Sequence, residues 1–243
     1  MTEFRRVLFR SDASEGRVRG VEAEVDGQTR RWPASHVLST IPLPVLARLL
    51  RGTPAPPHDV TALTYRAMVL VYLTLDADRF SEFDAHYFPE AAITISRMSE
   101  PKNYSLTARP GRTVLCSELP CQAAGEPWSL SDAALADLVV EDLRRAGLGP
   151  VPPIAAVHVE RLPQAYPLYT RGYREAFDAV DGFVGGVDGL ITFGRQGLFA
   201  HDNTHHAMDM AYALTDCLDA SGRFDRERWA RARTAFEDHV VED

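Results

Sequence analysis

The sequence of 243 residues predicts an α/β protein with an α+β portion, and three observations support this class. Residues 65–118 contain several runs rich in β-branched and aromatic residues, which is the composition of strands. Residues 129–149 carry apolar residues at helical spacing. Short apolar runs at 36–40 and 189–194 each lead into a helix-forming segment, an alternation found in α/β proteins.

The first third of the chain predicts a hairpin, a short strand and a helix. Residues 17–40 read as strand, turn and strand, with Asp26-Gly27 as the hairpin signal and a short buried strand at 36–40. The segment 41–52 has prolines near a helix start and a glycine just past its end. The proline-rich stretch 53–59 then predicts a crossing between domains.

The middle of the chain predicts a β-rich region followed by one clear helix. Ser131 is expected to cap the helix over 129–149, and Gly147 to end it. A turn at 163–173 is expected to lead into a second helix over 174–184. The strands expected in this region cover 66–76, 91–98, 112–119 and 155–162.

Composition and charge limit the classes of function. Hydrophobic residues make up 45% and charged residues 25%, as in soluble globular proteins, and the net charge of -8 without a basic cluster argues against a nucleic-acid partner. Three cysteines are too few for a disulfide framework, and Cys116 and Cys121 lack zinc-site spacing. The longest apolar run, 68–75, is too short to span a bilayer. We expect a cytoplasmic protein, with peripheral membrane association and oligomeric state left open.

The stretch "ITFGRQGLFAHDNTHHAMDMAYALTDCL", residues 191–218, has the layout of a ligand-binding loop. Gly194 permits close approach of a ligand, and the forked Arg195 side chain suits phosphate. Asp202, Asn203 or Thr204 can cap the following helix, whose first N–H groups attract an anion or an electron-rich carbonyl. A turn with a solvated arginine is the alternative.

The histidines of this loop raise the question of a metal. His201 and His205 are four residues apart, and His206 follows directly. A metal site needs further ligands and supporting partners, and none is spaced to provide them. We therefore expect no metal here and assign these histidines a capping or solvent-facing role.

Two segments resemble a known family. "GRQGLFAHDNTHHAMDMAYAL" is similar to the C-terminal flavin motif of the FAD-dependent amine oxidase and protoporphyrinogen oxidase-like superfamily, and "HVLSTIPLPVLARLL" resembles its strand-and-proline segment. The resemblance covers roughly residues 16 to 220. It implies an incomplete Rossmann-like FAD-binding domain interleaved with an antiparallel-sheet substrate domain. The implied divisions are part of the FAD-binding domain at 12–58, the substrate domain at 59–164, the return at 165–220 and a helical tail at 221–243.

The same resemblance assigns roles to individual residues. The glycine and arginine of the loop would lie near the FAD phosphates or ribityl chain, and the helix amides would face N1 and the C2 carbonyl of the flavin. The implied cofactor-binding residues are Thr40, Pro42, Gly194, Arg195, Asn203, Thr204 and His205. On the substrate side, Arg97, Lys102, Asn103 and Tyr104 are candidates, with a polar turn built by Ser99 and Pro101 as the alternative.

The glycine-rich phosphate-binding turn of this family is not found in the sequence. No G-x-G-x-x-G follows a strand, and the glycines of 182–189 precede one. We therefore expect this chain to be the C-terminal portion of a longer protein. Residues 1–11, "MTEFRRVLFRS", resemble the translation of a sequencing adapter and are expected to be non-native, and the C-terminus is expected to be clipped.

The resemblance implies an enzyme that moves a hydride from a small molecule to FAD. The flavin performs the redox chemistry, so we assign no protein nucleophile or catalytic dyad. One alternative is a flavin-dependent sugar-nucleotide mutase, for which Arg171, Tyr173 and Arg174 are candidates. Another is a non-catalytic remnant that binds no cofactor. A third is an unrelated α+β domain, in which the strands at 36–40 and 189–194 would lie apart.

Overall fold

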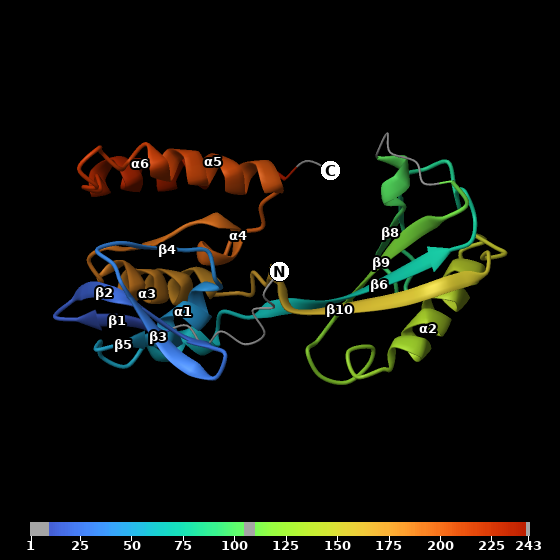
Figure 1. Cartoon of the computed structure of the whole chain (residues 1–243), viewed down its shortest axis with the longest axis horizontal. Helices are drawn as coiled ribbons and strands as arrows, with labels where there is room; N and C mark the ends of the chain where they lie inside the picture. Colours follow the sequence, from blue (N-terminus) through green and yellow to red (C-terminus); the bar gives the residue numbers. More distant parts are fainter. Residues whose placement is uncertain (1–9, 105–109, 242–243) are drawn as a thin grey trace. The chain divides into compact units, whose positions relative to one another are not determined.

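The computed structural model describes residues 10–104 and 110–241, which mix helices and sheets as predicted. The chain forms two compact units (Figure 1). Unit 1 contains the described residues up to Thr64 together with those from Pro167 onward, and unit 2 is Tyr65–Tyr166. The chain therefore leaves unit 1, builds unit 2 and returns, crossing after Thr64 and Tyr166 where the sequence placed the crossings after 58 and 164.

Unit 1 begins with a sheet in the order β3-β2-β1-β5. The hairpin turn falls on Asp26 and Gly27, whose φ angles of 53° and 73° fit the two positive-φ positions of a type I′ turn. Arg10 and Ser11, from the segment expected to be non-native, lie in the first strand, and residues 1–9 are outside the described part. The strands are β1 (Arg10–Ser14), β2 (Arg17–Val25), β3 (Gln28–Pro33) and β5 (Leu50–Arg51).

A second sheet of unit 1 pairs two strands far apart in sequence. Strand β4 (Val37–Ser39) runs parallel to β11 (Leu190–Thr192), with Leu38 opposite Ile191. The short strand expected at 36–40 is confirmed, although Leu38 is 44% exposed. The expected strand at 189–194 ends earlier, at Thr192, because Gly194 has a φ of 74° and starts the short helix α4 (Gly194–Gly197).

Helices complete unit 1. Helix α1 (Leu43–Leu49) follows β4, and the 3-10 turn η1 is His58–Thr61. Helix α3 (Tyr173–Gly185) buries Ala176, Val180 and Val184, and it confirms the helix expected over 174–184. Helices α5 (Thr204–Thr215) and α6 (Arg226–Phe236) pack together through a cluster. The buried members of the cluster are Ile191, Met210, Leu214, Cys217, Trp229 and Phe236.

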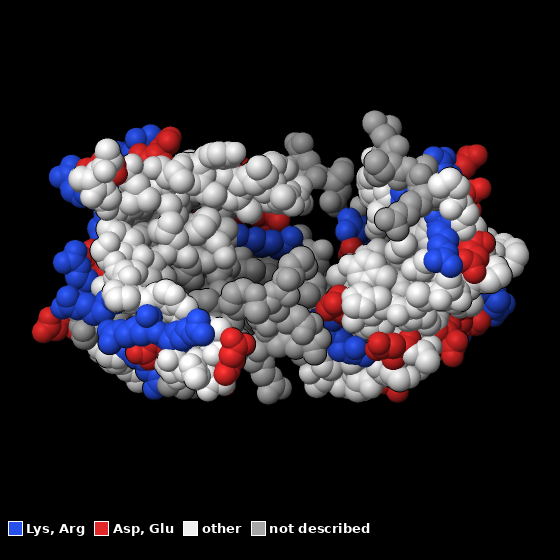
Figure 2. All heavy atoms as spheres, viewed as in Figure 1, with Lys and Arg blue, Asp and Glu red and all other residues white. Residues whose placement is uncertain are grey.

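Unit 2 is the antiparallel sheet that the sequence predicts, in the order β10-β6-β9-β8-β7. Strands β6 and β9, β8 and β9, and β7 and β8 pair antiparallel. The strands are β6 (Tyr65–Leu75), β7 (Ala85–Tyr87), β8 (Arg97–Ser99), β9 (Thr113–Cys121) and β10 (Ile154–Pro167). Charged side chains of both signs lie on each unit in the view of Figure 2.

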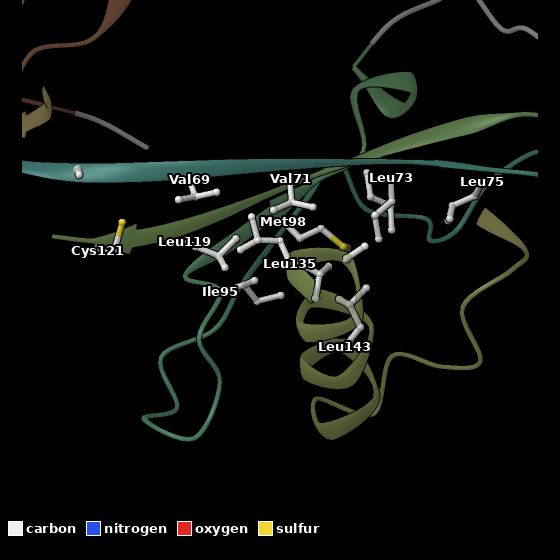
Figure 3. Close-up of a cluster of buried hydrophobic side chains, with 14 residues drawn as sticks. Val69, Val71, Leu73, Leu75, Ile95, Met98, Leu119, Cys121, Leu135 and Leu143 are labelled. Carbon is white, nitrogen blue, oxygen red and sulfur yellow. The ribbon is translucent and has the colours of Figure 1, made fainter. Parts of the chain in front are cut away.

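Helix α2 (Asp132–Arg145) covers one face of this sheet (Figure 3). The Ser131 side chain accepts a hydrogen bond from the Ala134 amide, which is the cap that the sequence predicts. Leu135 and Leu143 of the helix are fully buried against the strands. Apolar residues of one strand face, which alternate with half-buried ones, supply the other side of this core: Val69, Val71, Leu73 and Leu75.

Two strand predictions in unit 2 are wrong in extent. The run 91–98 contributes only β8 at its end, because the amides of Thr94 and Ile95 donate to the buried Asp142 carboxylate of α2, at 2.7 and 3.1 Å, instead of to a strand. The turn expected from residue 163 is strand, since β10 continues to Pro167. Strand β10 is the edge of the sheet, where a proline that lacks an N–H is tolerated.

Candidate functional site

The carboxyl ends of β4 and β11 bring two predicted cofactor segments together. The Phe193 amide donates to the Ser39 carbonyl at 3.1 Å, continuing the parallel pairing past the last strand residue. A Cβ on Gly194 would lie 3.5 Å from Cγ2 of Thr40. Ligands of open α/β sheets bind outside the carboxyl ends of parallel strands. Thr40 and Gly194 therefore lie side by side at the kind of edge where such ligands bind, and the third alternative, with the two strands apart, is wrong.

Glycines are required where this edge turns into α4. Gly194 is buried and has a φ of 74°, a conformation that side chains rarely adopt. A Cβ on Gly197 would lie 2.9 Å from the Ser39 carbonyl oxygen, closer than real contacts allow. The G-x-x-G pattern of "GRQG" is therefore explained by the close packing of α4 on the end of β4.

Hydrogen bonds hold the loop between α4 and α5 in one conformation. Nη1 of Arg195 donates to the Asp202 carbonyl at 3.1 Å, so this side chain spans the loop. The Tyr169 hydroxyl accepts from the His201 amide at 2.8 Å and donates to the Phe199 carbonyl at 3.3 Å. Phe199 is buried with a positive φ of 50°, a strained conformation that its aromatic neighbours maintain.

The start of α5 settles the choice of capping residue. Asn203 is the N-cap, its side chain accepts from the amide of His206, and Nδ1 of His206 accepts from the Asn203 amide at 3.2 Å. The capping role expected for a histidine thus belongs to His206, whereas His201 and His205 are exposed. One expectation needs correction, because the Asn203 amide is used inside this capping box and does not face outward.

Two amides at this helix start remain for a ligand. The first bond of the helix runs from the Ala207 amide to the Asn203 carbonyl, so the amides of Thr204 and His205 precede the regular ladder. Both residues are exposed. The helix dipole adds partial positive charge at this point.

The remaining predicted cofactor residues lie at the start of α1. Thr40 is exposed, and Pro42 is half-buried as the N-cap residue of α1. The Pro42 carbonyl accepts the amides of Val45 and Leu46, at 2.9 and 3.0 Å. Pro42 thus shapes the chain where β4 meets its helix.

The four predicted substrate residues are all in unit 2, and two of them support the fold. Nζ of Lys102 donates to the Asp78 and Arg112 carbonyls at 2.6 and 2.9 Å. Nδ2 of the Asn103 side chain donates to the Phe83 carbonyl at 2.7 Å and to the Glu100 carboxylate at 3.2 Å. These contacts match the polar turn considered as the alternative, which here includes the 3-10 turn η2 (Pro101–Asn103).

The other two substrate candidates each keep part of the side chain in solvent. Arg97 pairs with Glu118 on the adjacent strand. Burial acts to lower the pKa of Arg97, but the hydrogen bonds to Glu118 and Tyr87 outweigh it and raise that pKa. Tyr104 is 59% exposed. Either side chain can therefore be reached by a ligand from water.

Sequence reasoning missed a cleft of about 640 Å³ in unit 1. Tyr169 and Tyr173 stack there with ring centres 4.6 Å apart, and burial raises the pKa of Tyr169. Residues of the C-terminal tail form the other wall, and no local pattern links them to the loop. The cleft lies between α3, residues 198–202 and α6, and its lining includes Tyr169, Arg174, Phe199, Asp202, Arg233 and His239.

Comparison with protein families identifies the chain. Residues 3–206 match the family described as flavin containing amine oxidoreductase. The chain belongs to this family. No curated protein sequence matches it. Membership of the flavin amine oxidoreductase family implies a flavin cofactor. The paired ends of β4 and β11 bring together the two segments whose sequences resemble this family.

Solved structures share the fold of this flavin amine oxidoreductase family member at low identity. A reduced UDP-galactopyranose mutase is similar with a TM-score of 0.65 and 16% identity, covering 79% of this chain and 41% of that one. A candidate protoporphyrinogen oxidase from Exiguobacterium sp. 255-15 has a TM-score of 0.56 and 22% identity, and the match covers 76% of this chain and 41% of that one. An oxidoreductase from Methanosarcina mazei is similar with a TM-score of 0.52 and 16% identity, covering 79% of this chain and 43% of that one. The chain thus spans about two-fifths of these proteins.

Among the described residues, no helix combines the length and the apolar character needed to cross a membrane. Of the mutase candidates, Tyr173 and Arg174 line the cleft, and Arg174 bonds Glu237 at 2.7 Å. Arg171 is exposed.

Proposed function

We propose that this chain is part of an FAD-dependent oxidoreductase that oxidises a small molecule by hydride transfer to the flavin. The main observation behind this proposal is the parallel pairing of β4 with β11, which sets Thr40 beside Gly194 at the carboxyl ends of both strands. Family membership supports a flavin as the cofactor. The start of α5 offers two amides, those of Thr204 and His205, that precede the regular hydrogen bonds of the helix.

The first residues of α5 fit the electron-rich edge of a flavin ring. Thr204 and His205 are exposed residues, and their amides can donate to a carbonyl or an anionic nitrogen, with the helix dipole strengthening both bonds. FAD, when bound, would supply the hydride acceptor. Gly194 would admit the cofactor close to the backbone, and Arg195 would hold the loop in place through Asp202.

A flavin-dependent mutase is the second candidate, because a UDP-galactopyranose mutase shares the fold. A mutase would isomerise its substrate without net oxidation. The two reactions separate in anaerobic assays of the loaded enzyme, with an amine or related small molecule for oxidation, and with a nucleotide sugar and reduced flavin for isomerisation. Oxidation bleaches the flavin in proportion to product, whereas isomerisation leaves its redox state unchanged.

Replacing Thr204 with proline tests the amide contribution. Proline is tolerated at the first position of a helix but lacks the N–H, and Asn203 before it has the extended ψ of 170° that proline requires. Losing one hydrogen bond to a charged group costs about 1.5–3 kcal/mol, so we expect about ten- to hundredfold weaker binding of reduced FAD. The measurement is flavin titration of the full product of the gene that contains this sequence.

The matched control is Asp132→Pro at the first position of α2, where Ser131 has a ψ of 159°. This change should leave flavin affinity as it is. Equal losses in both variants would refute the amide contact, and a gene product without any flavin would overturn the whole proposal.

A further inference from the structure

Three side chains from distant parts of unit 1 meet beside the cleft. Asp202 and His206 flank the start of α5, and His239 follows α6. One ligand atom from each lies within 4.8 Å of the other two. All three side chains are withdrawn from solvent, with exposures of 5% for Asp202, 12% for His206 and 15% for His239.

The Asp202 carboxylate lies between the two rings. Its Oδ1 is 3.7 Å from Nδ1 of His206, and its Oδ2 is 3.6 Å from Nδ1 of His239. Ligands of a tetrahedral zinc ion, bound at about 2.05 Å, lie roughly 3.4 Å apart. These spacings are too long for hydrogen bonds and close to those around a shared cation.

Buried polar atoms in this cluster lack hydrogen-bond partners. Within the described residues, neither Oδ2 of Asp202 nor Nδ1 of His239 has one. Leaving a buried carboxylate oxygen and a ring nitrogen unsatisfied is costly. These two atoms lie 3.6 Å apart, and a cation bound to both would satisfy them. The His206 and His239 rings stack with centres 4.3 Å apart, so one ring has to turn for both to bind the same ion.

The surroundings suit a metal-bound histidine. Histidine ligands usually point their second ring nitrogen at a carboxylate. Nε2 of His239 lies 3.9 Å from the Asp209 carboxylate, which places an acid on the far side of the ring from Asp202. Nδ1 of His206 accepts the Asn203 amide at 3.2 Å, the long end of the normal range, and a cation could displace this contact.

We propose that Asp202, His206 and His239 form a binding site for a first-row transition-metal dication, with Zn²⁺ as the probe. Two imidazoles and one carboxylate are a known ligand set for zinc with an open fourth position. Asp202 and His239 also line the cleft. Sequence reasoning indicated no metal because it considered only His201, His205 and His206, and the tail histidine was not linked to them.

Zinc titration of the metal-free chain tests the site without any flavin, so its result is independent of the proposed function. We expect one Zn²⁺ per chain and a melting temperature raised by about 5–10 °C at a hundredfold excess over Kd. His239→Ala, beyond the last helix, should weaken zinc binding by at least about 100-fold, and Asp202→Asn should do the same.

The control is His158→Ala, which removes an exposed histidine that pairs with Glu160 at 2.8 Å in unit 2. It should bind zinc as the unchanged chain does. Cobalt substitution reports on geometry, because tetrahedral Co²⁺ gives visible absorption bands that His239→Ala should abolish. Zinc binding that is absent, or equal in His239→Ala and the unchanged chain, would overturn the proposal.

Discussion

Replacing Gly189 with alanine is expected to lower the free energy of unfolding of unit 1 by about 2–5 kcal/mol. Gly189 is buried immediately before β11 and has a φ of 80°. An added Cβ would overlap the Ser35 carbonyl oxygen and lie 2.8 Å from Cγ1 of Val18. The left-handed conformation and the overlap both oppose the substitution, and the backbone contact cannot move without breaking the bond from the Val37 amide to the Gly189 carbonyl.

A second glycine gives a control of opposite sign. Gly182 lies exposed inside α3, and a Cβ there would meet nothing within 4 Å. Gly182→Ala should therefore raise stability by about 0.5–1 kcal/mol, because alanine favours a helix interior. Urea unfolding followed by circular dichroism measures both changes. Similar small effects at both positions would show that β4 and β11 are not packed as described.

Removing the Glu100 carboxylate is expected to destabilise unit 2 by about 3–5 kcal/mol. Glu100 is fully buried, and it accepts the amides of Phe80 and Ser81 at 2.9 Å each. It also accepts the Thr113 hydroxyl at 2.5 Å and the Asn103 side-chain amide at 3.2 Å. Glu100→Ala removes the acceptor of the half-buried Phe80 and Ser81 amides and of the buried Thr113 hydroxyl, and each of these donors pays its own desolvation cost. The Asn103 side chain keeps the Phe83 carbonyl as an acceptor.

Hydrogen exchange followed peptide by peptide separates this effect from unit 1. In Glu100→Ala, amide protection should fall across β8 and β9 while α3 and α5 keep theirs. The control, Glu82→Ala, removes an exposed carboxyl group from a neighbouring loop and should change stability by less than about 0.5 kcal/mol. An unchanged exchange pattern in Glu100→Ala would show that this carboxylate does not hold the turn.

The buried Glu100 cluster also bears on substrate recognition. Lys102 and Asn103 have the polar character of a binding site, and the sequence pattern alone cannot distinguish that role from turn building. The structure directs both side chains to backbone carbonyls. Arg97 and Tyr104 stay as proposed substrate contacts of unit 2, since ligand can reach them from water.

Local patterns were sufficient where a few neighbouring residues decide the conformation. The Asp26-Gly27 turn, the Ser131 cap and the strand of 66–76 each depend on backbone preferences or on side-chain alternation within about ten residues. The loop motif likewise indicated a helix start suited to an electron-rich ligand. These features follow from short-range physics, so they could be derived before any packing was known.

Packing decided what the site contains. Thr40 meets Gly194 only because β4 and β11 pair, and His239 reaches Asp202 only because α6 folds back on α5. The Asn203 amide is turned inward by a histidine ring whose position depends on the first turn of α5. Contacts between such distant residues depend on which apolar faces bury one another, and a local pattern cannot specify this partner choice. The sequence by itself therefore determined the elements and the flavin-type loop, and the tertiary structure alone decided which residues gather around it.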